Sequence, residues 1–385
     1  AEGHKGSVRQ YLVLTLLSQA MMVGVFAATD VFLFYVFFEA ILVPMYFLIG
    51  RFGGPRATYA SVKFLLYSLV GGLFMLAALI GLWLVAAKQL GAGTFDWQTL
   101  TTLTIDEGTQ KWLFLGFGIA FAIKAPLVPF HTWLPDAAGE ATPGSATLLV
   151  GVLDKIGTFG MLRYCLPLFP LASAYFTPVV IVLSLIGIIY GALLAIGQSD
   201  IKRLIAYTSV SHFGFIVLGI FVFTSQSMSG AIFYMVNHGF STAALFLTAG
   251  YLISRRGSTL IEDFGGVNKI APVLSGSFLL AGLSSLALPG MSSFVSEFMV
   301  MVGTFTRYPG VAIASAFAVV FSALYILYMY QRVSTGEPSA EVAAISDLST
   351  RERIAIAPVI AIIVALGFLP QFVLSVATPA AQAVM

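Results

Sequence analysis

Residues 121–135, FAIKAPLVPFHTWLP, place a lysine, Lys124, well inside an apolar stretch and follow it with two prolines. Proline removes a backbone N–H and disrupts a helix interior, so Pro126 and Pro129 predict a broken helix. A broken helix beside an ionisable residue at bilayer depth is typical of transport proteins. The alternative is a kinked helix whose lysine extends its ammonium group to the membrane surface.

The composition of the whole chain also predicts a membrane protein. Hydrophobic residues make up 59% of the 385 residues and charged residues only 9%, whereas soluble domains are about 25% charged. This excludes a soluble enzyme, a disordered chain and a nucleic-acid-binding protein. The single cysteine, Cys165, excludes internal disulfides and thiolate metal clusters, and four scattered histidines do not suggest a metal site. No metal is therefore expected.

About eleven apolar segments are long enough to cross a bilayer, which requires roughly 20 residues. They are continuously apolar rather than alternating, which favours helices over a closed barrel. The fold class expected is an all-α polytopic membrane protein. The predicted spans are approximately 8–29, 31–50, 60–87, 112–135, 145–167, 174–197, 204–223, 228–254, 271–305, 310–331 and 353–377.

The spans assign every loop to one of two sides, and lysine and arginine divide unequally between them. Side A carries Lys5, Arg9, Arg51, Arg56, Lys63, Lys202, Arg203, Arg255, Arg256, Lys269, Arg332, Arg351 and Arg353, and side B carries Lys88, Lys111, Arg163 and Arg307. Cytoplasmic loops carry the excess of positive charge. Side A is therefore predicted to face the cytoplasm (or the matrix or stroma), with the C-terminus on the opposite side.

Five charged residues remain near the middle of predicted spans, away from the span ends: Glu39, Lys124, Asp154, Lys155 and Glu297. An ionisable group at bilayer depth costs at least about 2.5–3.5 kcal/mol and normally marks an ion or proton path. For Glu39 the alternative is a protonated carboxyl or a helix cap. Asp154 points about 100° away from Lys155 on a helix, and either a local counter-charge or a transport role fits it.

Two histidines also lie inside predicted spans. His212 occurs in SVSHFGF and His238 in MVNHGFSTAALF, and a proton-transfer role and a packing role are equally compatible with each. The nearby side chains that could hold water are Thr208, Ser209, Ser211, Asn237, Ser241 and Thr242. His131 and Asp136 follow the first break, and a loop or cap role near the cytoplasmic end is expected for both.

The pattern of spans predicts an internal repeat. The segment LPGMSSFVSEF at 288–298 contains a second helix break followed by Glu297. Two groups of five spans each carry an ionisable residue in the second span and a break in the fourth. Because five is odd, the groups are predicted to be inverted repeats. The expected domains are 1–170, 171–335, and 336–385 with a cytoplasmic loop and the final span.

Several separated motifs resemble the antiporter-like subunits of respiratory complex I and of multisubunit Na⁺/H⁺ antiporters. They are KAPLVPFHTWLPDAAGEATPGSATLLVGVLDKIGTFG, QSDIKRLIAYTSVSHFG, MVNHGFSTAALFLTAG and LPGMSSFVSEF. The similarity covers essentially the whole chain. It implies a fold of fourteen spans, of which this chain resembles the fourth to the fourteenth. An N-terminal piece is therefore expected to be missing before Ala1.

The resemblance also implies site residues. The family's proton pathway falls on Glu39, Lys124, Lys155, His212, His238 and Glu297, with His212 between the halves. A glutamate at position 297 is typical of one antiporter-like subunit of complex I, whereas its sister subunits L and N more often carry lysine. Asp154 and Ala138 depart from the pattern, since an apolar residue and a histidine are more common there.

The function implied is proton translocation in the membrane arm of NADH:quinone oxidoreductase, driven by quinone reduction elsewhere in the complex. No nucleotide, flavin, iron–sulfur or quinone motif occurs, so no cofactor is expected in this subunit. The implied partners are the lipid bilayer and other membrane-arm subunits, including L and N, in a bacterial cytoplasmic membrane. The alternatives are a subunit of a Na⁺/H⁺ antiporter and a structural scaffold of the membrane arm.

Overall fold

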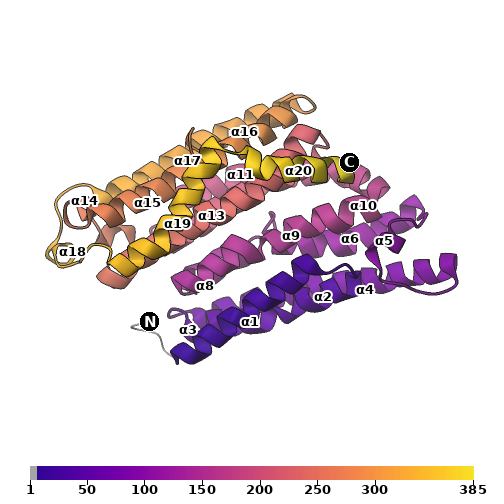
Figure 1. Ribbon diagram of the computed structural model, residues 1–385, viewed down its shortest axis with the longest axis horizontal. Helices are drawn as coiled ribbons and strands as arrows, with labels where there is room; N and C mark the ends of the chain where they lie inside the picture. The colour runs from indigo at the N-terminus through magenta and orange to yellow at the C-terminus, as the bar shows by residue number, and fades with distance from the viewer. Residues whose placement is uncertain (1–6) are drawn as a thin grey trace. The chain divides into compact units, whose positions relative to one another are not determined.

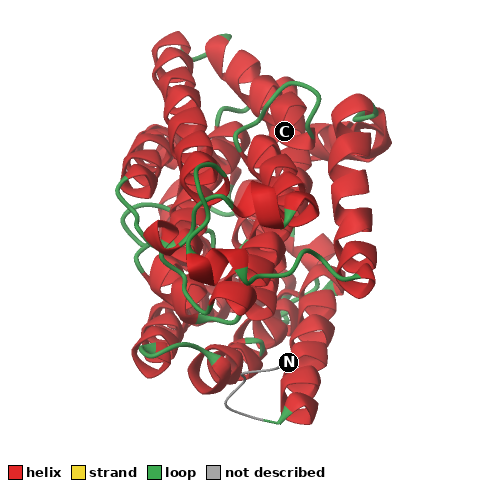
Figure 2. Cartoon of the chain, turned by 90° about the vertical axis from the view of Figure 1, so that its left-hand side faces the viewer, coloured by secondary structure: helices red, strands yellow, loops and turns green. Residues whose placement is uncertain are grey.

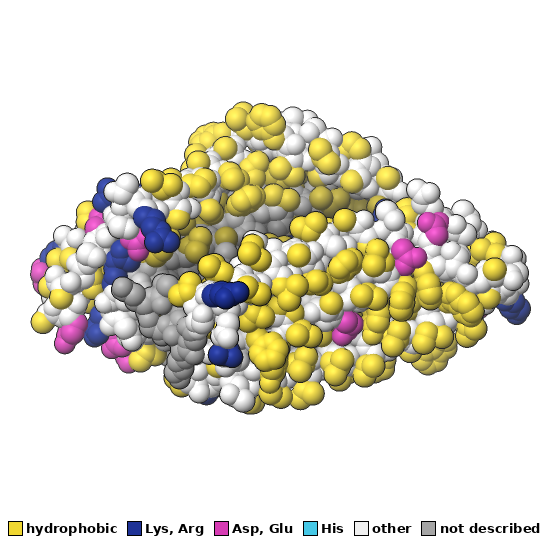
Figure 3. All heavy atoms as spheres, turned by 60° about the horizontal axis from the view of Figure 1, so that its bottom comes forward, with side chains coloured by type: hydrophobic (Ala, Val, Ile, Leu, Met, Phe, Trp, Pro, Cys, Tyr) yellow, Lys and Arg dark blue, Asp and Glu magenta, His cyan; other side chains and the backbone are white. Residues whose placement is uncertain are grey.

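The computed structural model describes residues 7–385, and over that range the chain is helical, with only two isolated β-bridges (Figures 1 and 2). Lys5, which the charge pattern assigns to side A, lies outside the described residues. Helices satisfy every backbone group internally, as lipid requires. Figure 3 shows a face covered mostly by hydrophobic side chains, with small groups of charged ones. The predicted all-α membrane fold is confirmed.

The predicted spans correspond to single helices or to runs of consecutive helices. These helices are α1 (Val8–Ala27), α2 (Val31–Ala40), α3 (Leu42–Phe52), α4 (Ala57–Leu90), α6 (Glu107–Lys124), α7 (Trp133–Glu140), α8 (Pro143–Leu148), α9 (Lys155–Gly160), α10 (Leu166–Leu168), α11 (Pro170–Ile196), α12 (Ile201–Phe221), α13 (Ser225–Arg256), α15 (Pro272–Ser285), α16 (Ser292–Phe305), α17 (Pro309–Ser334), α19 (Thr350–Phe368) and α20 (Gln371–Val384). The short connecting helices are α5 (Trp97–Leu100), η3 (Ile261–Asp263), α14 (Val267–Ile270) and α18 (Ala340–Ala343). Two π-helical segments, η1 (Leu149–Leu153) and η2 (Met161–Cys165), flank α9.

Among the described residues, eight helical segments are long and apolar enough to cross a membrane, and a bent pair makes a ninth. The predicted spans 112–135 and 271–305 contain the two helix breaks. In the first, α6 ends at Lys124 and α7 begins at Trp133; in the second, α15 ends at Ser285 and α16 begins at Ser292. Pro126 and Pro129 account for the first break and Pro289 for the second, because proline cannot donate the helical hydrogen bond.

The last predicted span, 353–377, differs from the structure. It consists of α19 and α20, which are bent by 68° at a break after Phe368. Pro370 is the reason, because it cannot donate a helical hydrogen bond and disfavours helical backbone at the residue before it. Leu369 accordingly adopts φ −125° and ψ 54°.

Contacts divide the chain into two compact units. The first unit comprises the described residues up to Ser145 together with Val152–Val180, and the second comprises Ala146–Gly151 and Ile181–Ala383. The first unit contains the break after Lys124, and the second contains the break after Ser285. Each unit is described by itself below.

The two units share a local motif at the start of the second helix of each. Asp30 accepts a hydrogen bond from a backbone N–H of α2 and forms a β-bridge with Asp96. Asp200 caps α12 in the same way and forms a β-bridge with Leu260. Side-chain capping of this kind satisfies a backbone donor that the helix leaves free. Counted from these aspartates, Ser209, rather than His212, occupies the place of Glu39.

The two breaks also share a backbone pattern. The amides of Leu127 and Leu288 each donate to the carbonyl oxygen five residues earlier, at 2.9 and 3.0 Å. This wide turn ends the first half of the broken helix in each unit, which is α6 in the first unit and α15 in the second. By this register Ser285 stands in the second unit where Lys124 stands in the first, so the two broken helices carry their charges at different positions.

Candidate functional site

Lys124 is a fully enclosed charged group of the first unit. It is the last residue of α6, and its side chain is fully buried. Its Nζ lies 4.8 Å from the centre of the Phe38 ring and 5.7 Å from that of Phe64. Among the described residues Nζ has no hydrogen-bond partner. The ring faces attract the cation, but they leave it without an acceptor for its protons.

Trp133 joins the two halves of this broken helix. Its indole Nε1 donates to the carbonyl oxygen of Ile123 at 2.9 Å, and the ring packs against Phe64 with centres 5.3 Å apart. The bond satisfies a carbonyl that the break would leave free at the end of α6. The contact holds the backbone next to Lys124 in place.

Glu39 of α2 is the carboxyl that faces this lysine from another helix. Its charge acts on Lys124, but the two groups form no ion pair, and the Oε1 atom of Glu39 is buried without a hydrogen-bond partner in the part of the chain described. A methyl group at Gly72 of α4 would overlap this carboxyl. Gly72 therefore provides the space in which the side chain of Glu39 lies.

Asp154 and Lys155 complete the charged groups of the first unit. Asp154 is fully buried at the junction of η1 and α9, and Lys155, the first residue of α9, is 5% exposed. The structure thus brings Glu39, Lys124 and Lys155 into one cluster, together with Asp154. We call these four residues the first-unit cluster.

The second unit contains a separate cluster, made of His212, Tyr234, His238 and Glu297. The imidazole ring centres of His212 and His238 are 5.2 Å apart and nearly perpendicular, and the ring of Tyr234 is 5.8 Å from that of His212. The Tyr234 hydroxyl donates to Oε2 of Glu297 at 2.6 Å. We call these four residues the second-unit cluster; they form a continuous polar line within a buried core.

Tyr234 and the nearby Tyr325 were not predicted from the sequence. Tyr325 is 2% exposed, and within the described residues its hydroxyl has no hydrogen-bond partner. Residues four apart share one helix face, so the spacing of Tyr234 and His238 on α13 could have pointed to Tyr234. Nothing in the sequence indicates that α17 brings Tyr325 near Glu297, because that depends on the packing of separate helices.

Tyr234→Phe is expected to slow proton translocation several-fold while the complex still assembles. A hydrogen bond to a carboxylate favours its charged form, and leaving a buried acceptor unpaired costs about 1–3 kcal/mol. The substitution removes that bond from Glu297 and so disfavours proton release. The measurement is the initial rate of NADH-driven acidification of proteoliposomes containing the purified complex.

The matched control for Tyr234→Phe is Tyr330→Phe in the same unit. It also removes one hydroxyl, which lies 3.2 Å from the Ser275 hydroxyl, outside the second-unit cluster. The control should keep the rate of the unmodified protein. Equal rates for Tyr234→Phe and the control would refute a role for the Tyr234 hydroxyl.

A cavity of about 210 Å³ lies at the second break, and Glu297 is one of the residues that line it. It is lined by Leu286, Ala287, Leu288, Pro289, Phe294, Glu297, Met301, Val319 and Ala323. Ala287 has φ 60°, a backbone conformation uncommon outside glycine. The break therefore leaves a gap beside a carboxyl that is otherwise enclosed.

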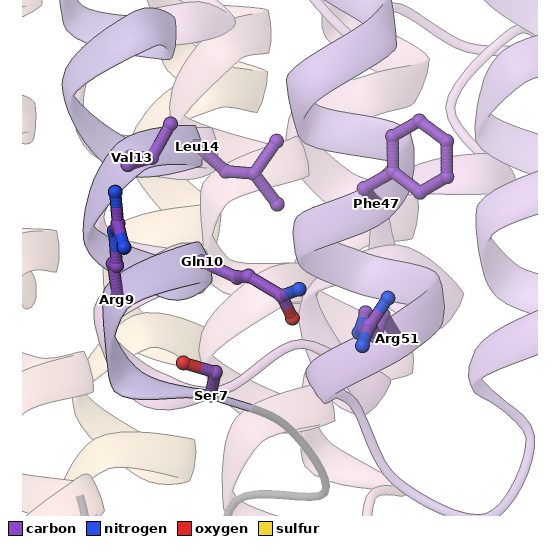
Figure 4. Close-up of a pocket in the computed structure, with 7 residues that line it drawn as sticks. All are labelled: Ser7, Arg9, Gln10, Val13, Leu14, Phe47 and Arg51. Atoms are coloured by element: carbon purple, nitrogen blue, oxygen red, sulfur yellow. The ribbon is translucent and has the colours of Figure 1, made fainter.

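A larger cavity, of about 590 Å³, lies between the ends of α1 and α3, where Arg9 and Arg51 border it (Figure 4). None of its lining residues belongs to either cluster. Asp136, one of the two residues after the first break, forms an ion pair with Lys63 at 2.7 Å. The cavity beside Arg9 and Arg51 and the ion pair between Lys63 and Asp136 are therefore separate from the two clusters.

The side chains gathered in the two clusters suit proton transfer. Carboxyl, amine and imidazole groups can each take up and release a proton. Within residues 7–385 no group of three or more His, Cys, Asp or Glu side chains is arranged to hold a metal ion.

Comparisons with known proteins agree with this reading of the fold. A sequence model described as "NADH:quinone oxidoreductase/Mrp antiporter, TM" matches residues 28–324. NADH-quinone oxidoreductase subunit M of Mycobacterium tuberculosis is 54% identical over 98% of this chain and 69% of its own length. Subunit M of Rickettsia prowazekii is 42% identical over 97% of this chain and 75% of its own length.

Solved structures are similar as well. A chain of respiratory complex I from Thermus thermophilus superposes with a TM-score of 0.91 and 34% identity, covering 97% of this chain and 79% of that one. A chain of the Mrp complex from Dietzia superposes with a TM-score of 0.84 at 23% identity, covering 96% of this chain and 77% of that one. At 23% identity, the similarity to the chain of the Mrp complex shows a shared fold alone.

Proposed function

The chain belongs to the NADH:quinone oxidoreductase/Mrp antiporter membrane family, and from that premise we propose that its two buried clusters are the groups that carry protons. It is a multi-pass integral protein of the bacterial membrane and a proton-translocating membrane-arm subunit of the complex I type. Its relatives are named as parts of an oxidoreductase, and its own role in that enzyme is translocation.

The single observation that carries the residue assignment is that Lys124 is fully buried and that its Nζ has no hydrogen-bond acceptor among the described residues. A fully buried lysine without a hydrogen-bond acceptor is expensive to keep charged. A nearby carboxylate offsets that cost, and Glu39 is placed to supply it. When Glu39 approaches, Lys124 holds a proton; when Glu39 moves away, Lys124 passes the proton on. The glycine at position 72 leaves room for the carboxyl where it lies, since a Cβ there would overlap it.

The second-unit cluster also carries protons in this proposal. His238 and His212 receive them, because imidazole exchanges protons readily near neutral pH. Tyr234 connects the histidines to Glu297 through its hydroxyl. Glu297, which borders the cavity at the second break, releases the proton on side B.

We assign no redox step to this chain. Its buried titratable groups are proton carriers, and the energy for their movement would come from quinone reduction elsewhere in the complex. The membrane-arm subunits are its partners, and we propose that the direct neighbours are the sister subunits L and N. A cofactor bound by this subunit is not required by the mechanism.

Sodium dependence tests this proposal against a Na⁺/H⁺ exchange function. The lysines and histidines of the two clusters carry protons and are poor Na⁺ ligands, and we propose that their carboxyl groups also carry protons rather than sodium, so the complex is expected to acidify proteoliposomes at the same rate, within twofold, in sodium-free potassium buffer. The measurement is NADH-driven acidification with and without Na⁺, together with uptake of labelled sodium. Acidification that requires Na⁺, with stoichiometric sodium movement in the opposite direction, would favour the exchanger.

A further inference from the structure

Asp154 is a buried carboxyl that the scheme above does not use. Its side chain is fully buried, and both carboxyl oxygens lack a hydrogen-bond partner among the described residues. It forms no ion pair in that part of the chain, although its immediate neighbour in the sequence is Lys155. Buried charged groups are normally paired or hydrogen-bonded. An unpaired carboxyl in this position therefore needs an explanation.

The packing of α9 shows which way this carboxyl lies. Gly157 is so close to the end of α6 that a Cβ there would be 2.6 Å from the carbonyl oxygen of Phe121 and 2.8 Å from Cβ of Ala125. Residues three apart share a helix face, so Asp154 is on the face of α9 that packs against α6. That is the end of α6 where Lys124 is located.

The electrostatic interactions of Asp154 agree with this placement. The charge of Asp154 interacts most strongly with Lys155 and also with Lys124. Lys124 in turn interacts with Glu39 and with Asp154. Asp154 is thus the carboxyl that both lysines of the first-unit cluster share, while Glu39 acts on Lys124.

The backbone at Asp154 is also unusual. The π-helical segment η1 ends at Leu153, directly before Asp154, and α9 begins directly after it. Single π turns are frequent at functional sites because they widen the helix locally. Asp154 therefore lies at the junction of a π-helical and an α-helical segment.

We propose that Asp154 is a proton carrier between Lys124 and Lys155; this rests on the function proposed above. In the first step an N–H bond of the Lys124 ammonium breaks and an O–H bond forms on the Asp154 carboxylate, which leaves both groups neutral. In the second step the O–H bond breaks and the neutral amine of Lys155 gains the proton. The carboxylate is then restored, and no other reactant is consumed.

A fixed counter-charge is the competing role for Asp154. A carboxylate retained to neutralise a lysine would be expected to contact it, because buried ion pairs need close geometry and hydrogen bonds. The two unpartnered oxygens of Asp154 do not show such a contact. A carrier, in contrast, must be able to leave each partner.

The test is the ratio of protons translocated to NADH oxidised in the complete complex, reconstituted in proteoliposomes. Asp154→Asn keeps the shape of the side chain but cannot carry a proton, and it is expected to lower the ratio to the value of Lys124→Ala. Asp154→Glu keeps the carboxyl and is expected to retain most of the ratio. Native gel electrophoresis verifies that each variant is assembled.

The outcomes separate this inference from the proposed function. An unchanged ratio in Asp154→Asn, with a lowered ratio in Lys124→Ala, overturns the role of Asp154 and leaves the proposed function standing. If both ratios are unchanged, both proposals are wrong. If the Asn variant does not assemble, Asp154→Glu decides, because a ratio as low as that of Lys124→Ala would contradict a carrier.

Discussion

Lys124→Ala is expected to lower proton translocation through this subunit by about 100-fold while the subunit still inserts and assembles. A positioned acid–base group typically contributes about 10²–10⁴-fold to a proton transfer. No other described side chain on α6 can replace the amine, since Lys124 is enclosed by Phe38 and Phe64. The measurement is the initial rate of NADH-driven acidification, normalised to assembled complex.

Two controls accompany Lys124→Ala. Lys124→Arg keeps a positive charge but cannot release its proton at any ordinary pH, so it is also expected to stop translocation. Lys269→Ala removes a surface cation that is paired with Glu337 at 2.5 Å, and it is expected to change the rate by less than twofold. Near-normal translocation in Lys124→Arg would show that the charge of Lys124, and not its proton, is what matters.

Glu297→Gln is expected to cause the second largest loss, again about 100-fold. The amide oxygen of glutamine can still accept the hydrogen bond from Tyr234, so the local packing should survive. The amide cannot take up a proton, and the second-unit cluster then has no group that can release one at the cavity. The measurement is the same acidification rate, with assembly verified on a native gel.

The comparison variant for Glu297→Gln is His212→Ala in the same cluster. His212 has a second imidazole 5.2 Å away, in His238, which can continue to accept protons. The loss in His212→Ala is therefore expected to be smaller than in Glu297→Gln. The reverse order would contradict the assignment of Glu297 as the exit group.

Much of the fold could be predicted from the sequence, because few backbone conformations satisfy their own hydrogen bonds within lipid. The continuous apolar segments require helices, and the prolines at 126 and 129 require a break after Lys124. The charged residues inside spans are informative for the same reason, since lipid excludes them unless they face other protein groups. These arguments use only local sequence and the properties of the solvent.

The arrangement within each cluster could not be obtained in this way. Nothing in the sequence distinguishes Tyr234 from the other tyrosines. Its hydroxyl donates a hydrogen bond to Glu297 only because α13 packs against α16. Gly72 likewise acquires a role only because α2 places Glu39 against it. Such contacts join residues far apart in the chain, and they cannot be predicted from the periodicity of the sequence.

The internal repeat illustrates the same limit. The order of spans and breaks predicts it, but its register depends on hydrogen bonds of the folded chain. The capping aspartates equate Glu39 with Ser209, and the breaks equate Lys124 with Ser285. Neither position carries a charge in the second unit.

The most direct test of the account is the number of protons translocated per NADH oxidised by assembled complex carrying Lys124→Ala. The account predicts a ratio clearly below that of the unmodified complex, because a buried proton carrier has been removed. A ratio equal to that of the unmodified complex, at equal amounts of assembled enzyme, would contradict the claim that the buried charges of this chain carry protons.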